Sequence, residues 1–137
     1  MVQLNGILES AIYVSDMERA QRFYEGVMGL NPIFADHRLT AYDAGGKSVL
    51  LVFLRGASAT SSALAGGVIP GHDGAGPLHF AFAIDTGELG PWEDRLKAHG
   101  VAIEGRMDWP RGGKSLYFRD PDGHLVELAT PGLWPVY

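Results

Sequence analysis

The chain contains one pattern of strands and a helix twice. Residues 9–14 and 79–84 each alternate between the two faces of a strand, and each begins with an ionisable side chain. A helical pattern follows each segment, and three further strand candidates follow each helix. These candidates are predicted at 31–36, 39–44 and 47–54 in the first half and at 101–107, 114–119 and 124–130 in the second. A βαβββ order that occurs twice in 137 residues indicates an internal duplication.

The helices between the strands make the predicted class α+β. Ser15 and Glu18 have the spacing of a capping box, so the first helix is predicted to begin there and to end at Gly29. The second helix is predicted from about 90 or 91 to His99, followed by a terminating glycine.

Length and composition predict one domain, residues 1–137. The first module covers about 5–55 and the second about 77–130. A net charge of −5 with scattered basic residues argues against nucleic acid and anionic membranes as partners. The chain has no cysteine, no apolar run of transmembrane length and no signal-peptide pattern, so we expect a cytoplasmic protein.

The connection between the modules, residues 56–76, is rich in glycine, alanine and serine. A segment of about twenty residues without regular structure is uncommon in a compact domain and is usually a linker or a functional flap. The linker is the simpler interpretation. His72 near its end is either a solvated loop residue or a residue that contacts substrate.

Strand parity brings three potential metal ligands onto one face. Glu9, His79 and Glu127 are each predicted on the face that carries small side chains, while the opposite face of their strands is bulky and apolar. The small residues leave space beside the ionisable groups, which predicts a cup that holds a ligand.

A single His or Glu on a strand commonly has only a structural role. Two carboxylates and one imidazole on a shared face differ, because burying such groups without a partner is costly. A divalent cation compensates the charges, and mixed nitrogen and oxygen ligation suits Mn, Fe, Ni, Zn or Co. Glu9, His79 and Glu127 are therefore the predicted metal ligands.

Several segments resemble the vicinal oxygen chelate superfamily. The most specific is Tyr117-Phe-Arg-Asp-Pro-Asp-Gly-His-Leu-Val-Glu127. The resemblance covers nearly the whole chain and extends over residues 9–24, 27–30, 79–82 and 113–128. This superfamily includes glyoxalase I, fosfomycin-resistance thiol transferases, extradiol dioxygenases and the metal-free bleomycin-resistance proteins.

The resemblance implies paired βαβββ modules that form a cup-shaped mixed sheet, the glyoxalase/bleomycin resistance/dihydroxybiphenyl dioxygenase fold. It also implies a metal that chelates adjacent substrate oxygens, with Glu9, His79 and Glu127 at the ligand positions. Glyoxalases use a fourth carboxylate at the end of the first module. By the internal repeat that position is Leu50, which cannot bind a metal, so we expect no glyoxalase activity.

Other departures weaken the likeness to the fosfomycin enzymes. Those enzymes usually have His at the first ligand position, where this chain has Glu9. Ser115 and Tyr117 match their pattern, but a cationic position is Met107 and a hydroxyl position is Ala11.

The strand around Ser115 is the predicted substrate surface. Ser115 and Tyr117 share a face, and the resemblance would direct the Tyr117 hydroxyl into the cup as a donor to a substrate oxyanion. A core tyrosine with its hydroxyl at the rim is the alternative. Arg111 and Lys114 lie in a loop and would meet an anionic substrate, or else are solvated charges.

Two functions stay open. The first is a metal-dependent lyase, isomerase or oxygenase with Glu127 and Tyr117 as catalytic groups. The second is a metal-free small-molecule binding protein of the bleomycin-resistance type. The three candidate ligands favour the enzyme. Because one module closes only half a cup, the resemblance also implies a homodimer that shares each site, with Glu9 from one subunit and His79 and Glu127 from the other.

Overall fold

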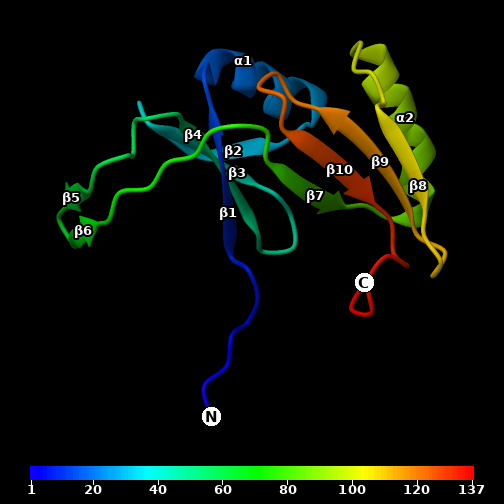
Figure 1. Ribbon diagram of the computed structural model, residues 1–137, viewed down its shortest axis with the longest axis horizontal. Helices are drawn as coiled ribbons and strands as arrows, with labels where there is room; N and C mark the ends of the chain where they lie inside the picture. The colour runs from blue at the N-terminus through cyan, green and yellow to red at the C-terminus, as the bar shows by residue number, and fades with distance from the viewer. The chain divides into compact units, whose positions relative to one another are not determined.

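The computed structural model describes all 137 residues, which divide into two compact units, Met1–Ala75 and Gly76–Tyr137. Each unit contains one four-stranded sheet and one helical segment (Figure 1). The order is βαβββ in both units, so the predicted α+β class and the internal repeat are confirmed. Whether the two units close on each other as one domain stays a prediction.

The sheet of the first unit has the order β1-β4-β3-β2. Its strands are β1 (Glu9–Val14), β2 (Asn31–Ala35), β3 (Leu39–Asp43) and β4 (Val49–Leu54). β1 runs parallel to β4, and the other pairs are antiparallel. Ile12, Val14, Leu50 and Val52 are buried, whereas Glu9 on the other face of β1 is exposed. The period of two therefore predicted the buried face of β1 correctly.

The sheet of the second unit repeats this topology in the order β7-β10-β9-β8. Its strands are β7 (His79–Ala83), β8 (Gly105–Asp108), β9 (Lys114–Arg119) and β10 (Leu125–Ala129). β7 runs parallel to β10. Leu116, Phe118, Val126 and Leu128 alternate with the polar residues of β9 and β10 and are fully buried. This apolar face gives the second unit its core.

The first helix, α1 (Met17–Gln21), continues into a π-helical turn, η1 (Arg22–Val27). Its N-cap is Asp16, whose carboxylate accepts a hydrogen bond from the backbone N–H of Arg19 at 3.1 Å. The prediction of a capping box at Ser15 is therefore wrong. Both residues are good N-caps, and the Ser15 hydroxyl instead accepts from the Arg19 guanidinium.

The second helix, α2 (Leu89–Ala98), follows a 3₁₀ turn, η2 (Thr86–Glu88). It ends in a Schellman motif: the Val101 N–H donates to the Leu96 carbonyl and Gly100 has φ 71°. The residues directly after the helix thus cap its C-terminus and do not extend the strand. β8 therefore begins at Gly105, four residues later than predicted.

The connection 56–76 contains a short hairpin, β5 (Ser62–Leu64) and β6 (Gly67–Ile69). In Figure 1 the hairpin projects away from the four-stranded sheet of its own unit. The segment is therefore more than the structureless linker that its composition favours.

A turn precedes β10, with Gly123 at φ 84° and its N–H donating to the Asp120 carbonyl. His124 is fully buried, and its Nδ1 accepts the backbone N–H of Leu78 at 2.9 Å. This contact joins the turn to the start of β7, so His124 has a structural role.

None of the helices has both the length and the apolar composition needed to cross a membrane. The cytoplasmic location stays a prediction.

Candidate metal and ligand site

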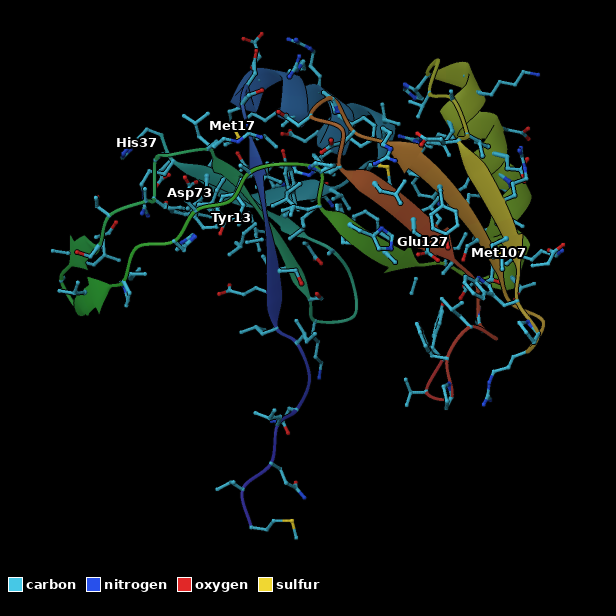
Figure 2. All side chains as sticks on the ribbon, viewed as in Figure 1. Tyr13, Met17, His37, Asp73, Met107 and Glu127 are labelled. Carbon is cyan, nitrogen blue, oxygen red and sulfur yellow. The ribbon has the colours of Figure 1, made fainter.

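The register of the second sheet brings His79 and Glu127 together. On β10, Leu125 pairs with His79 on β7, and Glu127 pairs with Tyr117 on β9. The Nε2 atom of His79 lies 3.2 Å from Oε1 of Glu127. Figure 2 marks Glu127 on β10. Its side chain is only 7 % exposed, whereas that of His79 is 50 % exposed. The pair therefore sits at the surface with its carboxylate inward.

Hydrogen bonds from outside the pair fix both side chains. The Nδ1–H of His79 donates to the Leu125 carbonyl at 2.9 Å, which leaves Nε2 toward the carboxylate. The Ser115 hydroxyl donates to Oε2 of Glu127 at 2.6 Å, and the Trp109 indole N–H donates to Ser115 at 2.8 Å. A metal-binding His is held in this way when its second nitrogen donates to a carbonyl.

The distance between Nε2 and Oε1 suits two neighbouring metal ligands. Bonds of roughly 2.0–2.2 Å, about 90–110° apart, place donor atoms roughly 3–3.5 Å from each other. Within either unit, however, no three His, Asp or Glu side chains gather into a group that could hold a metal. His79 and Glu127 therefore fit a metal as a pair that needs a further ligand.

Tyr117 belongs to the same cluster. Its ring centroid lies 6.2 Å from that of His79. Burial and, second, the negative charge of Glu127 raise the pKa of the Tyr117 phenol above its ordinary value. The hydroxyl therefore stays protonated at neutral pH and is available as a donor.

The remaining predicted residues of this unit are placed differently. The Lys114 ammonium pairs with Asp108 at 2.7 Å, and Lys114 has the opposite strand parity to Ser115. Arg111 is exposed in the turn before β9. Met107 pairs with Ser115 across the sheet and offers a thioether instead of a cation. Of the predicted substrate residues on this loop and strand, only Ser115 and Tyr117 contact the cluster.

Glu9 lies in the first unit, exposed at the start of β1. It lines a hollow of about 560 Å³ on the sheet of that unit. The complete set of Glu9, His79 and Glu127 stays a prediction.

The register corrects the position of the missing fourth ligand. Glu9 pairs with Val49 as His79 pairs with Leu125, so the residue equivalent to Glu127 is two positions beyond Val49. That residue is Leu51, not Leu50. Leu51 lines the hollow with Glu9, whereas Leu50 is 2 % exposed on the buried face. The position is still a leucine without metal-binding atoms.

His72 is held against the first sheet. Its Nδ1 lies 2.8 Å from the Tyr13 hydroxyl, and its ring packs edge-on against Phe53 with centroids 4.6 Å apart. His72 is half-buried and lines the same hollow as Glu9. The interpretation of His72 as a solvated loop residue is therefore wrong.

Comparison with known proteins places this architecture in one family. A family model described as the glyoxalase/bleomycin resistance protein/dioxygenase superfamily matches residues 6–128. The chain belongs to this superfamily.

Individual members of the superfamily resemble the chain over different lengths. A metallothiol transferase FosB from Shouchella clausii is 31 % identical over 93 % of the chain and 81 % of its own length. A catechol-2,3-dioxygenase from Bacillus subtilis is 34 % identical over 84 % of the chain, which spans only 38 % of that protein. The crystal structure of a lactoylglutathione lyase from Agrobacterium tumefaciens is 33 % identical with a TM-score of 0.86, covering 96 % of this chain and 98 % of that one.

The sequence alone did not predict the groups that hydrogen-bond to His79 and Ser115 and so hold the site in place. Neither the Trp109 indole nor the Leu125 carbonyl has a sequence signal that marks it as a partner of the site. The Gly71-His72-Asp73-Gly74 motif did carry a signal, because two glycines around one His indicate close backbone approach.

Proposed function

We propose that this protein is a metal-dependent enzyme of the superfamily, a lyase, isomerase or oxygenase that chelates a small oxygenated substrate. Glu9, His79 and Glu127 would hold the metal. The observation that carries the proposal is the contact of His79 Nε2 with Glu127 Oε1. The other nitrogen of His79, Nδ1, and the other oxygen of Glu127, Oε2, already have hydrogen-bond partners.

The bound metal would act as a Lewis acid on adjacent substrate oxygens. The residues of the chain position it and supply protons. Ser115 keeps Glu127 oriented, and Tyr117 presents its hydroxyl as a donor to a substrate oxygen that gains negative charge. With Leu51 at the fourth position, three protein ligands would leave room for both substrate oxygens.

The relatives support an enzyme without selecting a reaction. Their names describe a thiol transferase, a dioxygenase and a lyase, which are three different chemistries on one scaffold. A metal-free binding protein is the second candidate. It is favoured by the finding that neither unit alone gathers three metal-binding side chains.

Metal analysis separates the two candidates. The protein would be purified from unsupplemented cultures and from cultures with Mn, Fe or Ni, and metal-free protein would be titrated with Co²⁺. We expect one metal per site, a thermal shift on metal addition and loss of both in His79→Ala and Glu127→Gln. The exposed His37→Ala serves as the matched control. No stoichiometric metal and no thermal shift under any condition would favour the binding protein.

The proposal includes a homodimer in which each site takes Glu9 from one subunit and His79 with Glu127 from the other. A mixing experiment tests this arrangement. Glu9→Ala and His79→Ala variants, each unable to bind metal, would be refolded together. Shared sites regenerate one intact site per heterodimer. A monomer by light scattering, or no recovery of metal binding, would exclude sharing and leave the ligand set standing.

The absent fourth carboxylate also limits the reaction. We expect no isomerisation of the hemithioacetal of methylglyoxal and glutathione. Robust turnover of that substrate would show that the leucine at position 51 does not separate this protein from glyoxalases.

A further inference from the structure

The hollow of the first unit has aromatic walls. Its volume of about 560 Å³ lies within the roughly 300–1,000 Å³ of small-molecule sites. Tyr13, Phe34, Phe53 and His72 line it with four rings. Tyr13 and Phe53 stack with centroids 5.8 Å apart, and His72 stands edge-on to both rings. Such walls favour a flat, apolar ligand.

Two glycines seat His72 on this wall. A side chain at Gly74 would overlap the Tyr13 ring, and one at Gly71 would overlap the backbone of Ala59. The His72 N–H donates to the Ser58 carbonyl at 2.8 Å. The next residue, Asp73, accepts the Gly56 N–H at 3.0 Å. Figure 2 shows Tyr13 and Asp73 in the same part of this unit. Hydrogen bonds thus hold the end of the 56–76 connection to its beginning, with His72 at the hollow.

The contact with Tyr13 determines what His72 offers to a ligand. A phenol is a better donor than acceptor, so the Tyr13 hydroxyl donates to Nδ1 of His72. Burial and, second, Asp73 raise the pKa of Tyr13, which keeps that proton in place at neutral pH. A neutral imidazole then carries its proton on Nε2, and this N–H is the donor.

The charges in the hollow select against anions. Arg38 is already engaged, since its guanidinium donates to Ser62 at 2.9 Å and lies 3.7 Å from Asp36. Glu9 is exposed at the same hollow, and its carboxylate repels an anion. A neutral ligand with a hydrogen-bond acceptor fits this combination.

We infer that the hollow of the first unit binds a neutral aromatic carbonyl compound, with its ring against the rings of Tyr13 and Phe53 and its carbonyl oxygen on the Nε2–H of His72. That this ligand is the substrate rests on the proposed function, because Glu9 lines the same hollow. Binding itself needs no metal.

Three probes of similar size test the inference on chelator-treated, metal-free protein. Acetophenone has the ring and the acceptor, toluene only the ring, and cyclohexyl methyl ketone only the acceptor. Dissociation constants would come from amide NMR titrations. We expect acetophenone to bind about five- to tenfold more tightly than either other probe, as one hydrogen bond or one stacked ring provides. The shifts should centre on Tyr13, Phe53 and His72.

Two variants separate the donor from a structural effect. His72→Phe keeps the ring and should abolish the preference for acetophenone over toluene while toluene still binds. Phe53→Leu should abolish the preference for acetophenone over cyclohexyl methyl ketone. His37→Ala should change neither. A retained preference in His72→Phe, or no shifts in the first unit, would overturn the inference.

A long-range ¹H–¹⁵N spectrum of the His72 ring gives a test that needs no variant to fold. We expect the Nε2–H tautomer, and the Nδ1–H tautomer would overturn the inference. These readouts use metal-free protein, so their failure leaves the metal measurements unaffected and is distinguishable from failure of the proposed function.

Discussion

The two units have the same backbone frame and different chemistry. Both sheets have a parallel edge pair and two antiparallel pairs in the same order. At equivalent register positions the second unit has polar groups where the first has aliphatic ones. The equivalent pairs are Leu39 and Ser115, Ala41 and Tyr117, and Leu51 and Glu127.

This difference shows how one backbone arrangement can carry two kinds of surface, one polar and one apolar. In the second unit, the buried carboxylate of Glu127 requires hydrogen-bond partners, and Ser115 and Trp109 provide a chain of them. In the first unit the same face is apolar and leaves a hollow. In the proposed function, the second unit would therefore supply the metal-binding pair and the first unit the shape of the ligand site.

The largest expected effect comes from placing a carboxylate at the fourth-ligand position. Leu50→Glu puts a charge on the buried face and should destabilise the protein by about 3–5 kcal/mol. Leu51→Glu puts the same group in the hollow beside Glu9 and should leave the fold intact. Urea unfolding of both variants measures the difference.

The same pair of variants tests the equivalence of Leu51 and Glu127. If the register argument holds, Leu51→Glu should raise metal affinity by about tenfold, since it adds an anionic ligand. Equal destabilisation by both substitutions would contradict the assignment of the two faces. An unchanged metal affinity in Leu51→Glu would contradict its place at the metal.

The next largest effect is expected from removing the hydrogen bond that Ser115 donates to Glu127. Ser115→Ala removes the donor to its Oε2 and leaves the Trp109 N–H without that acceptor. We expect about a 10–100-fold loss of metal affinity, typical of outer ligand contacts, and about 1–2 kcal/mol of stability. Calorimetric metal titration measures the affinity. Ser61→Ala, exposed in the 56–76 connection, is the control and should change neither quantity.

Strand periodicity was sufficient to predict most of the frame. Alternation over residues 9–14 separated Glu9 from Ile12 and Val14 correctly, because one face of a strand is buried and the side chains alternate strictly. The turn at 120–123 was also predictable, since its proline and glycine fix the backbone angles.

Long-range pairing was not predictable from the sequence. The parallel pairing of Glu9 with Val49 joins residues forty positions apart, and the sequence repeat alone indicates Leu50, one residue before the equivalent position. The support of His79 by the Leu125 carbonyl depends on the same kind of register. The contact between Tyr13 and His72 joins residues 59 positions apart, and the glycines around His72 indicate close packing without identifying Tyr13 as its partner.

A smaller effect on stability is expected from the N-caps of the two helices, which differ between the units. α1 has the Asp16 side chain as its cap, whereas Glu88 before α2 makes no capping hydrogen bond through its side chain. Asp16→Ala should therefore cost about 1 kcal/mol and Glu88→Ala close to nothing. Ser15→Ala should cost less than Asp16→Ala, because Asp16 is the N-cap whose carboxylate accepts the Arg19 N–H. Thermal unfolding of the three variants measures this, and a larger cost for Ser15→Ala than for Asp16→Ala would restore the capping box.

The smallest expected effect is on the pKa values of two tyrosines, Tyr13 at the hollow of the first unit and Tyr117 beside His79 and Glu127. Burial raises the pKa of both Tyr13 and Tyr117, and Asp73 and Glu127 respectively add to it. Because each folded-state pKa lies above the unfolded value of 10.0, this contribution to stability is complete below pH 10 and is lost as pH rises through the folded pKa.

Removing either carboxylate should lower the pKa of its tyrosine only part of the way, since burial remains. The variants are Asp73→Asn for Tyr13 and Glu127→Gln for Tyr117, and ¹³C NMR titration of the ring signals measures the shifts. Tyr42, whose pKa is raised by burial and by Glu25, should not move in either variant and is the internal control. A Tyr117 that titrates at its ordinary pKa in the unmodified protein, or whose pKa does not respond to Glu127→Gln, would show that the carboxylate proposed as a metal ligand does not affect its hydroxyl. In that case the proposed role of the second unit would depend on the His79 and Glu127 pair alone, without Tyr117.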